Sequence, residues 1–391
     1  MTVWLIEPHD PLIVRDGKPF GPNPGARATS LAFPFPSTTT GGARTRAGLD
    51  DKGNFNTALI DTVKKISVRG PLLVELVKDG TAITNWLFPA PADALLFPKE
   101  QDEKAAIVTR LVPLKLFDDT ITDFDNKNED GLWFIGPPVS NGSKPTKDAP
   151  RFWNQKDFMQ WLRTPTNQEK QLELLGHNGP TPEERLHVSI DPNTGAAIDG
   201  ALFETTGLEF THTKKHQLQT ARRLALAVII DDEKQPKEGL TSFGGERRIV
   251  SWQKSESDFL ECPPMLADQI VNDGACRVLL LTPAYFNNGY RPAWIEQSRE
   301  GVKPELKAIA IQRPQVVSGW DFVTKGPKPT RRLAPAGTVL FLSLKDNEPV
   351  AIRKWIESTW MHCISDNPQD NRDGFGLAVL GTWSGKPVEM L

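Results

Sequence analysis

Arginine stands close to glycine in four stretches of the chain, a combination suited to contacting a phosphate backbone. The stretches read RDGKPF (15–20), FPSTTTGGARTR (35–46), SFGGERRIVSW (242–252) and RDGFGLAVLGTW (372–383). Glycine lets a backbone approach a phosphodiester and present its amides as donors. Arginine supplies charge and a planar surface that stacks on a base. Each stretch alone is typical of an ordinary turn, but together they indicate a surface that follows an RNA backbone.

The hydroxyl-rich stretch predicts the beginning of a helix. The two Phe-Pro pairs at 33–36 favour an extended arm, because each Pro fixes one φ angle and biases the residue before it. Ser37 or Thr38 then suits an N-cap, and Arg44 is expected in the first turns of the helix. First-turn amides and the helix dipole attract phosphate. The alternative is a capped surface helix with solvated arginines.

Other signatures of ligand binding or catalysis are mostly missing from the sequence. There is no GxxxxGK[ST] loop and no HExxH motif, and GFGLAVLG (374–381) has the wrong spacing for a dinucleotide fingerprint. His212 and His216 share an i, i+4 spacing, but they follow an expected strand end, which argues against a metal pair. The aspartates at 118–125 lack the Gly and terminal Glu of a calcium loop and indicate a solvated acidic loop. We expect no cofactor and no metal.

Composition limits the class of protein. A chain of 391 residues has room for two or three domains, and no apolar run approaches the roughly 18 residues of a membrane span. The three cysteines lack CxxC spacing and the first residues lack a signal-peptide pattern, so a cytoplasmic location is expected. The net charge of −3 argues against a free-standing nucleic-acid binder. Basic residues concentrate at 11–48 and 303–332, which leaves room for one basic face.

The elements that would position these arginines are mainly strands. Val3–Ile6 and Arg277–Leu281 are short aliphatic runs that end near Pro, so both predict buried strands and hint at two related domains. Residues 187–195 alternate and then turn, and 201–211 resume the alternation, which predicts a long β-hairpin. Leu224–Ile230 is a further expected strand. We therefore predict an α+β chain built on ferredoxin-like sheets.

Several blocks, in their order along the chain, resemble a known family. They are WLIEPHDPLIVRDGKPF, FPFPSTTTGGARTRAG, HVSIDPNTGAAIDGALFETTGLEF, SFGGERR, LLLTPAYFNNGYRPAW, VSGWDF…GPKPTRRLAPAGTVLFL and GFGLAVLGTW. Together they resemble the third Cmr subunit of type III-B CRISPR effector complexes, a family of the RAMP superfamily of RNA-binding proteins. The two N-terminal blocks are the most specific. The acidic stretch near 100–150 matches no motif of the family and has the character of an insertion.

The resemblance implies a non-catalytic subunit in an antiviral ribonucleoprotein. Such a subunit has two ferredoxin-like (RRM-like) domains, which on this chain correspond to 1–258, with an insertion around 100–180, and 259–391, with the glycine-rich loop. It holds the 5′ tag of the CRISPR RNA and contacts the large polymerase/cyclase subunit and the backbone subunits. It meets target RNA only indirectly and needs no membrane. A subunit that forms part of an RNA channel need not be basic overall.

Carried onto this sequence, the resemblance and the Gly–Arg stretches imply a set of RNA-binding residues. The predicted residues are Arg15, Lys18, Ser37, Thr38, Thr39, Gly41, Gly42, Arg44, Arg46, Gly244, Gly245, Arg247, Arg248, Gly374 and Gly376. Arg15 and Lys18 have the alternative role of ordering the N-terminal loop.

Two other functions remain open from the sequence. The main alternative is a metal-independent endoribonuclease that processes CRISPR RNA, with His9 as general acid or base and Arg44 as a stabiliser of transition-state charge. Against it, His9 lies in a Pro-flanked turn and no second acid or base is evident. The other alternative is a protein scaffold without RNA contact, which leaves the clustering of Arg with Gly unexplained.

Overall fold

The computed structural model describes most of the chain. The described residues are 1–15, 27–28, 30–99, 102–117, 120, 131–139, 142–212, 221–318, 320–321, 326–327, 329–345 and 347–389. The chain forms two compact units: unit 1 comprises Met1–Asn85, Gly179–Phe259 and Val316–Arg332, and unit 2 comprises Trp86–Asn178, Leu260–Gln315 and Leu333–Leu391. Both mix helices with a larger share of strand, so the predicted α+β class is confirmed. The units do not follow a single cut near 258, because residues 86–178 pack with the C-terminal part of the chain.

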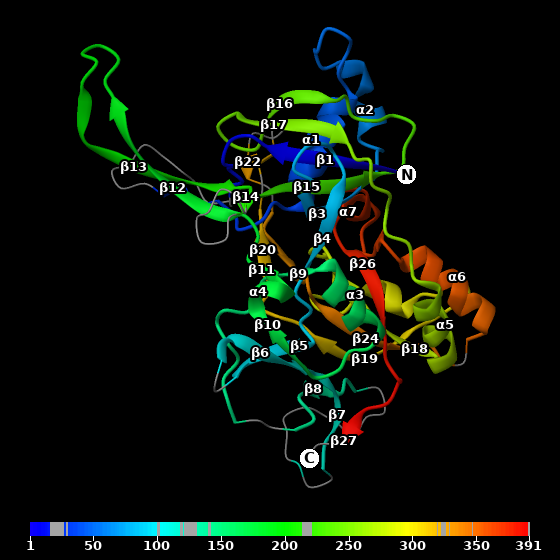
Figure 1. The fold of residues 1–391 in the computed structure, drawn as a ribbon. Helices are drawn as coiled ribbons and strands as arrows, with labels where there is room; N and C mark the ends of the chain where they lie inside the picture. Colours follow the sequence, from blue (N-terminus) through cyan, green and yellow to red (C-terminus); the bar gives the residue numbers. More distant parts are fainter. Residues whose placement is uncertain are drawn as a thin grey trace. The chain divides into compact units, whose positions relative to one another are not determined.

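The core of unit 1 is an antiparallel sheet with the order β3-β15-β1-β17-β16 (Figure 1). Its strands are β1 (Thr2–Pro8), β3 (Val68–Leu76), β15 (Arg222–Ile230), β16 (Gly239–Phe243) and β17 (Arg248–Lys254). The residues of β1 from Val3 to Ile6 are all buried, so this strand is covered on both faces. The two strands predicted at Val3–Ile6 and Leu224–Ile230 are thereby confirmed.

Helix α1 (Pro36–Ala47) packs on this sheet and begins earlier than the sequence predicts. Its N-cap is Phe35, which makes no side-chain capping bond, and Pro36 opens the helix. The predicted cap at Ser37 or Thr38 is therefore wrong. Proline is favoured at the first helical position, since its fixed φ is already helical and its missing N–H would have no partner there. As a result Arg44 lies in the last turn and not in the first turns.

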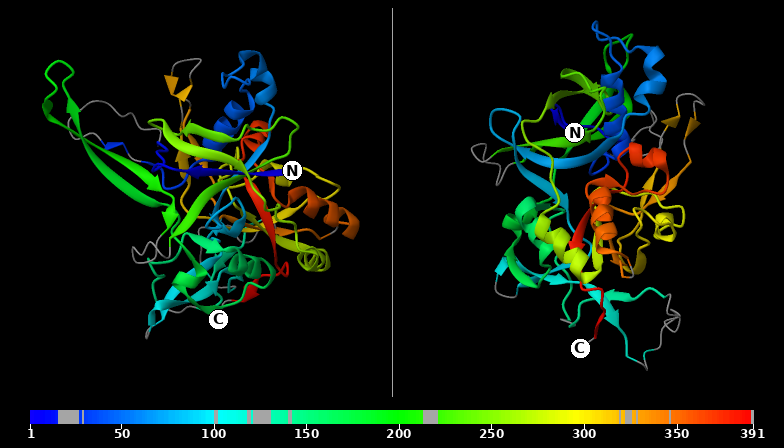
Figure 2. Two further views of the ribbon diagram at one scale, coloured as in Figure 1. Left: turned by 45° about the horizontal axis from the view of Figure 1, so that its top comes forward. Right: turned by 90° about the vertical axis from the view of Figure 1, so that its right-hand side faces the viewer.

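A long hairpin leaves the sheet of unit 1. Strands β12 (Thr181–Ile190) and β13 (Ala197–Glu209) are antiparallel, and Figures 1 and 2 show them reaching well beyond the sheet strands of their own unit. At its base, Leu12 and Leu208 exchange backbone hydrogen bonds of 2.8 and 2.9 Å. The hairpin predicted from residues 187–211 is confirmed, and its base is tied to the N-terminal segment that carries Arg15.

Unit 2 has its own antiparallel sheet, in the order β19-β24-β18-β26-β25. The strands are β18 (Ala275–Leu280), β19 (Glu305–Ala310), β24 (Val339–Ser343), β25 (His362–Cys363) and β26 (Leu377–Thr382). Helices α5 (Pro264–Asp273) and α6 (Pro349–Thr359) pack beside each other and against β26. Strand β18 is buried along its whole length, which confirms the strand predicted at Arg277–Leu281.

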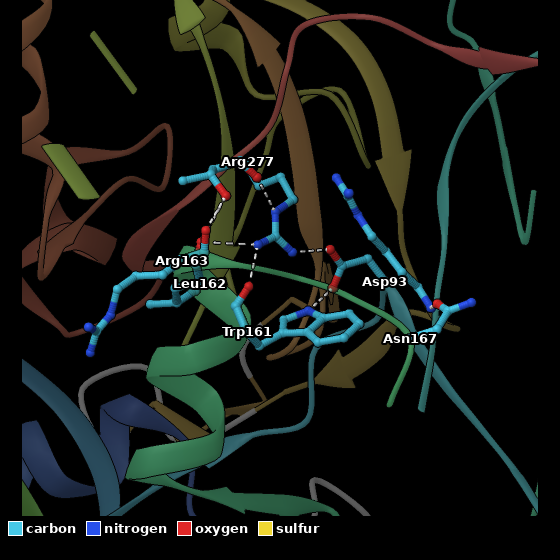
Figure 3. A network of polar contacts seen from close by, with 8 residues as sticks. Asp93, Trp161, Leu162, Arg163, Asn167 and Arg277 are labelled. Atoms are coloured by element: carbon cyan, nitrogen blue, oxygen red, sulfur yellow. Dashed lines mark hydrogen bonds and ion pairs between the residues drawn. The ribbon is translucent and has the colours of Figure 1, made fainter. Parts of the chain in front are cut away.

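A buried ion pair crosses the core of unit 2 (Figure 3). The Arg277 guanidinium donates to the carboxylate of Asp93, and both side chains are completely buried. Trp161 Nε1 donates to the other oxygen of Asp93 at 2.9 Å, while Arg277 donates to the carbonyls of Thr382, Trp161 and Leu162. Every charged group of the network is thus hydrogen-bonded, which is what makes a buried ion pair tolerable.

The other elements are shorter. In unit 1 they are β2 (Arg27–Ala28), η1 (Thr57–Leu59), α2 (Ile60–Val63), β14 (Thr211–His212), β21 (Trp320–Asp321) and β22 (Gly326–Pro327), and in unit 2 β5 (Ala94–Lys99), β6 (Asp102–Arg110), β7 (Val112–Lys115), β8 (Phe134–Gly136), β9 (Phe152–Asn154), α3 (Gln155–Arg163), β10 (Gln168–Gln171), α4 (Leu172–Leu175), β11 (Gly176–His177), η4 (Ala293–Glu296), α7 (Pro368–Arg372) and β27 (Val388–Glu389). Strands β4 (Ile83–Pro89), β20 (Gln315–Val317) and β23 (Arg331–Leu333) run from one unit into the other. None of the described helices is both long and apolar enough to span a membrane.

Candidate RNA-binding surface

The turn between β16 and β17 has an unusual backbone conformation. The last cross-strand pair is Phe243 with Arg248, so residues 244–247 form the turn. Gly244 has a φ of 71°, and the two non-glycine residues Glu246 and Arg247 have φ values of 55° and 53°. A left-handed conformation costs a non-glycine residue about 1–3 kcal/mol and persists only where the surroundings enforce it. The turn is therefore held in place by its neighbours.

The N-terminal segment supplies that restraint. The Gly245 N–H donates to the Ile13 carbonyl at 2.7 Å. A Cβ atom on Gly244 would lie 2.5 Å from the same carbonyl oxygen, and one on Gly245 would lie 3.0 Å from the Ile13 side chain. The two glycines thus permit close approach of the protein's own backbone. The sequence analysis had instead attributed these glycines to the close approach of an RNA backbone.

Two arginines pair with one carboxylate at this turn, and a third arginine lies next to it in the sequence. Arg15 Nη2 and Arg248 Nη2 lie 3.3 and 3.4 Å from the two oxygens of Glu246. Arg247 is exposed, and Arg248 Nε is buried without a hydrogen-bond partner among the described residues. We call Arg15, Glu246, Arg247 and Arg248 the turn cluster. Its formal charge is +2, and both ion pairs are long enough to exchange for an incoming anion.

The arginines of α1 are used differently. Arg44 donates to the Ile66 carbonyl from Nε and Nη2, at 3.3 and 2.9 Å. Arg46 is 7% exposed and donates to the carbonyls of Lys237 and Glu238. Burial lowers the pKa of Arg46 from its ordinary value, and its position among carbonyls keeps the cation hydrogen-bonded. These two arginines tie α1 to neighbouring loops of unit 1 and lie in its last turn, so they are not at the N-terminus of the helix, where the sequence analysis expected them.

The hydroxyl and glycine residues of α1 divide between core and surface. Thr39 is buried and donates to the Pro36 carbonyl at 3.0 Å, whereas Ser37 and Gly41 are exposed. A Cβ on Gly41 would meet nothing within 4 Å, but one on Gly42 would lie 2.6 Å from the Phe243 ring. Gly42 therefore brings α1 against the strand that enters the turn cluster. Thr38 is half-buried.

The glycine-rich loop before β26 lies inside unit 2. Gly374 and Gly376 are buried, with φ values of 91° and 81°. The Gly376 N–H donates to the Pro283 carbonyl at 2.8 Å, and Thr282 Oγ1 donates to the Gly374 carbonyl at 2.7 Å. Its backbone is thus occupied by contacts within the unit, and the amide of Gly376 is not available to a phosphate.

The chain matches one protein family along almost its whole length. The family model of the CRISPR-associated protein Cas_Cmr3 covers residues 4–383. The chain belongs to the Cas_Cmr3 family. The resemblance seen in the sequence is therefore confirmed. No curated protein matches the chain.

The Cas_Cmr3 chain is also similar to chains of solved effector complexes. One belongs to a cryo-EM structure of the type III-B Cmr-beta bound to cognate target RNA and AMPPnP, with 12% identity, a TM-score of 0.44, and coverage of 91% of this chain and 87% of that chain. A second, from Cmr-beta bound to cognate target RNA, has 15% identity, a TM-score of 0.42 and coverage of 87% and 86%. A third, from the Csm3-Csm4 subcomplex of a type III-A interference complex, has 12% identity, a TM-score of 0.31 and coverage of 88% and 94%.

Some sequence predictions for this Cas_Cmr3 protein fall outside the described residues. They concern Lys18, His216, the side chain of His212 and most of the acidic loop at 118–125. Within the described residues, no group of three or more His, Cys, Asp or Glu side chains could hold a metal ion. His9, the candidate acid or base of the nuclease alternative, is exposed, and its backbone N–H donates to the Ile249 carbonyl at 2.9 Å.

The sequence reasoning missed Glu246 as part of the site. A carboxylate directly before two arginines in a two-glycine turn was a usable signal, because the opposite charges are only one and two positions apart. Its second partner, Arg15, lies 231 positions away and follows only from the tertiary structure. Ile13 was missed as well, since an aliphatic side chain in the sequence gives no sign that its carbonyl fixes a distant turn.

Proposed function

We propose that this Cas_Cmr3 protein is a non-catalytic RNA-binding subunit of a type III-B CRISPR ribonucleoprotein. In this role it holds the 5′ tag of the CRISPR RNA and bridges the large polymerase/cyclase subunit to the backbone subunits in antiviral defence. Its two units are then ferredoxin-like (RRM-like) modules. The membership in the Cas_Cmr3 family supports the proposal, and the turn cluster is the observation that carries its RNA-binding part.

The turn cluster suits a phosphate backbone better than it suits a base edge. Arg247 is exposed, and Arg15 and Arg248 each form a long ion pair with the Glu246 carboxylate. Arginine binds phosphate through paired N–H donors, and such contacts fix the position of the RNA without reading its sequence. An RNA phosphate that displaces Glu246 would also provide an acceptor beside Arg248 Nε, which has no hydrogen-bond partner among the described residues. The bases of a single-stranded tag would then be splayed toward other side chains.

The exposed part of α1 extends this surface. Gly42 packs α1 against Phe243, the residue immediately before the turn, so the exposed Ser37 and Gly41 belong to the same unit as the turn cluster. A small exposed residue leaves room for a sugar–phosphate backbone, whereas Arg44 and Arg46 serve the fold. The proposed RNA path therefore follows the turn cluster and not the arginines of α1.

Co-purification tests the proposal. The tagged chain is expressed with and without the proteins encoded beside it, and bound RNA is sequenced. The proposal predicts a multi-subunit complex that contains CRISPR RNA with a constant 5′ end. Protein that is free of RNA in both preparations would contradict it and favour a scaffold. Cleavage of precursor RNA by the isolated chain, lost in His9→Ala, would favour the nuclease.

A further inference from the structure

One face of the β12–β13 hairpin is an exposed aliphatic surface. Leu186, Val188 and Ile190 alternate along β12 and are 71%, 40% and 54% exposed. Leu202, which lies directly opposite Val188 on β13, is 50% exposed. Because side chains alternate between the two faces of a strand and directly paired residues share a face, Leu186, Val188 and Leu202 lie on one side of the ribbon, and Ile190 follows them along β12 beyond a shift in the pairing register. We call these four residues the aliphatic face.

The opposite face of the hairpin is occupied by its own contacts. His187 stacks on Phe203 with 5.1 Å between the ring centroids, and its Nε2 lies 2.9 Å from Thr205 Oγ1. Arg185 pairs with Glu183 at 2.6 Å. The hairpin thus satisfies one face internally, while the other carries exposed aliphatic side chains. Exposed apolar groups gathered in this way mark an interaction site.

The hairpin's position in the fold does not explain the aliphatic face. The strands of the unit 1 core, β3, β15, β1, β17 and β16, form their sheet without β12 or β13. Figures 1 and 2 show the two strands projecting from that sheet. A third strand, β2, pairs with β13 at Glu204 and Thr205, so within the described residues the ribbon beyond these two positions is two-stranded. A two-stranded ribbon is only marginally stable in water, so a partner that covers one face would stabilise it.

The charge of the hairpin decides which class of partner fits. Residues 181–209 contain six carboxylates, Glu183, Glu184, Asp191, Asp199, Glu204 and Glu209, against the single basic residue Arg185. Glu204 lies directly opposite Leu186 and therefore on the same side of the ribbon as the aliphatic face. A phosphate backbone would be repelled by this surface, and so would a second copy of the same hairpin. A protein surface with an apolar strip edged by Lys or Arg is complementary to it.

We infer that the aliphatic face of the β12–β13 hairpin docks on another protein subunit of the same complex, on an apolar strip bordered by basic side chains. The inference rests on the proposed function, because that function supplies a complex with further protein subunits. Within this one unit, the acidic hairpin then serves protein assembly while the basic turn cluster serves RNA. The interface is completed by burying Leu186 and Leu202 against apolar side chains and by pairing the exposed Glu184 with cations.

Site-specific photocrosslinking in the assembled complex tests which molecule covers this face. p-Benzoylphenylalanine replaces Leu186 or Leu202, and the matched control carries it at Arg185, an exposed residue of the other face. The expected product is a nuclease-resistant adduct to another protein subunit, formed from positions 186 and 202 and much less from 185. The crosslinked peptide should contain aliphatic residues beside Lys or Arg. A nuclease-sensitive adduct, an adduct to a second copy of this chain, or no adduct in an assembled complex would overturn the inference.

Charge substitution gives a second test, because a protein partner and an RNA partner predict opposite changes in binding. The double change Leu186→Lys and Leu202→Lys should weaken retention of the crosslinked subunit at least tenfold, because it places cations against a basic rim. If RNA occupied the face, the same change would strengthen binding, which would overturn the inference. Ser189→Lys with Thr194→Lys adds the same charge away from the aliphatic face and should leave retention unchanged. RNA content is measured separately, so a complex that shows the protein adduct but lacks RNA contradicts the proposed function alone.

Discussion

Helix α1 and the β16–β17 turn carry the similar sequences Gly–Gly–Ala–Arg and Gly–Gly–Glu–Arg, and the structure uses them in different ways. In α1 the guanidinium groups of Arg44 and Arg46 donate to backbone carbonyls of neighbouring loops. In the turn, Arg247 is exposed and Arg248 shares one carboxylate with Arg15. Arginine close to glycine in the sequence therefore indicates either hydrogen bonds that stabilise the fold or a site for an anion. The partner of the guanidinium distinguishes the two.

The glycines differ in the same way. Gly244 is required by the carbonyl of Ile13, whereas Gly41 faces open space in the middle of a helix. A glycine in a motif is thus informative only when its neighbours are known. The comparison gives the following predictions, ordered from the largest expected effect to the smallest.

Gly244→Ala should cause the largest loss of stability. Its Cβ would lie 2.5 Å from a backbone oxygen, at a φ of 71° that disfavours any side chain. We expect the free energy of unfolding to fall by about 3 kcal/mol, measured by urea denaturation. Gly41→Ala is the matched control and should stabilise the chain by up to about 1 kcal/mol, since alanine favours a helix interior. Equal effects of the two changes would contradict the account of the turn.

Arg46→Ala should also destabilise the fold, but less than Gly244→Ala does. The change leaves the carbonyls of Lys237 and Glu238 without their donor in a largely buried setting. Loss of such a charged donor costs about 2 kcal/mol. Arg247→Ala, at an exposed position, should stay within about 0.5 kcal/mol of the wild type in the same denaturation experiment. A stable Arg46→Ala variant with reduced RNA affinity would reverse the assignment of the two regions.

Glu246→Gln should strengthen RNA binding. The change removes the negative charge between Arg15 and Arg248 and keeps the shape of the side chain. Exposed ion pairs are worth about 0–1 kcal/mol, so we expect an increase in affinity of about threefold, largest at low salt. Competition binding with CRISPR RNA measures it, and Glu183→Gln on the hairpin serves as the control. Weaker RNA binding by Glu246→Gln would indicate that the carboxylate orients the arginines for RNA.

Much of the fold could be predicted from local sequence patterns. Four aliphatic or aromatic residues in a row at Val3–Ile6 predict a strand buried on both faces, and the turn residues after Ile190 predict the hairpin. The start of α1 was misplaced because Pro36 at the first helical position outweighed the capping preference of Ser37 and Thr38. Two local preferences gave different starting points for the helix, and the sequence alone did not show which one was stronger.

The parts of the site that could not be predicted depend on distant contacts. Arg277 lies in an otherwise aliphatic run, and its burial follows from Asp93, which is 184 positions away. Arg15 meets Glu246 only because the N-terminal segment pairs with the β16–β17 turn at Gly245. Arg46 looked like a surface arginine because the carbonyls that receive it belong to residues 237 and 238. In each case the decisive partner is set by tertiary structure.

The most direct test of the central claim is the salt dependence of RNA binding by the reconstituted complex. Each phosphate contact made by a cation on a single strand contributes about 0.7 to the slope of log K against log salt. We predict that Arg247→Ala lowers the slope by about this amount and weakens binding. Arg353→Ala, on α6 and paired with Asp268 at 2.8 Å, should leave the slope unchanged. An unchanged slope and affinity for Arg247→Ala would contradict the assignment of the turn cluster to RNA.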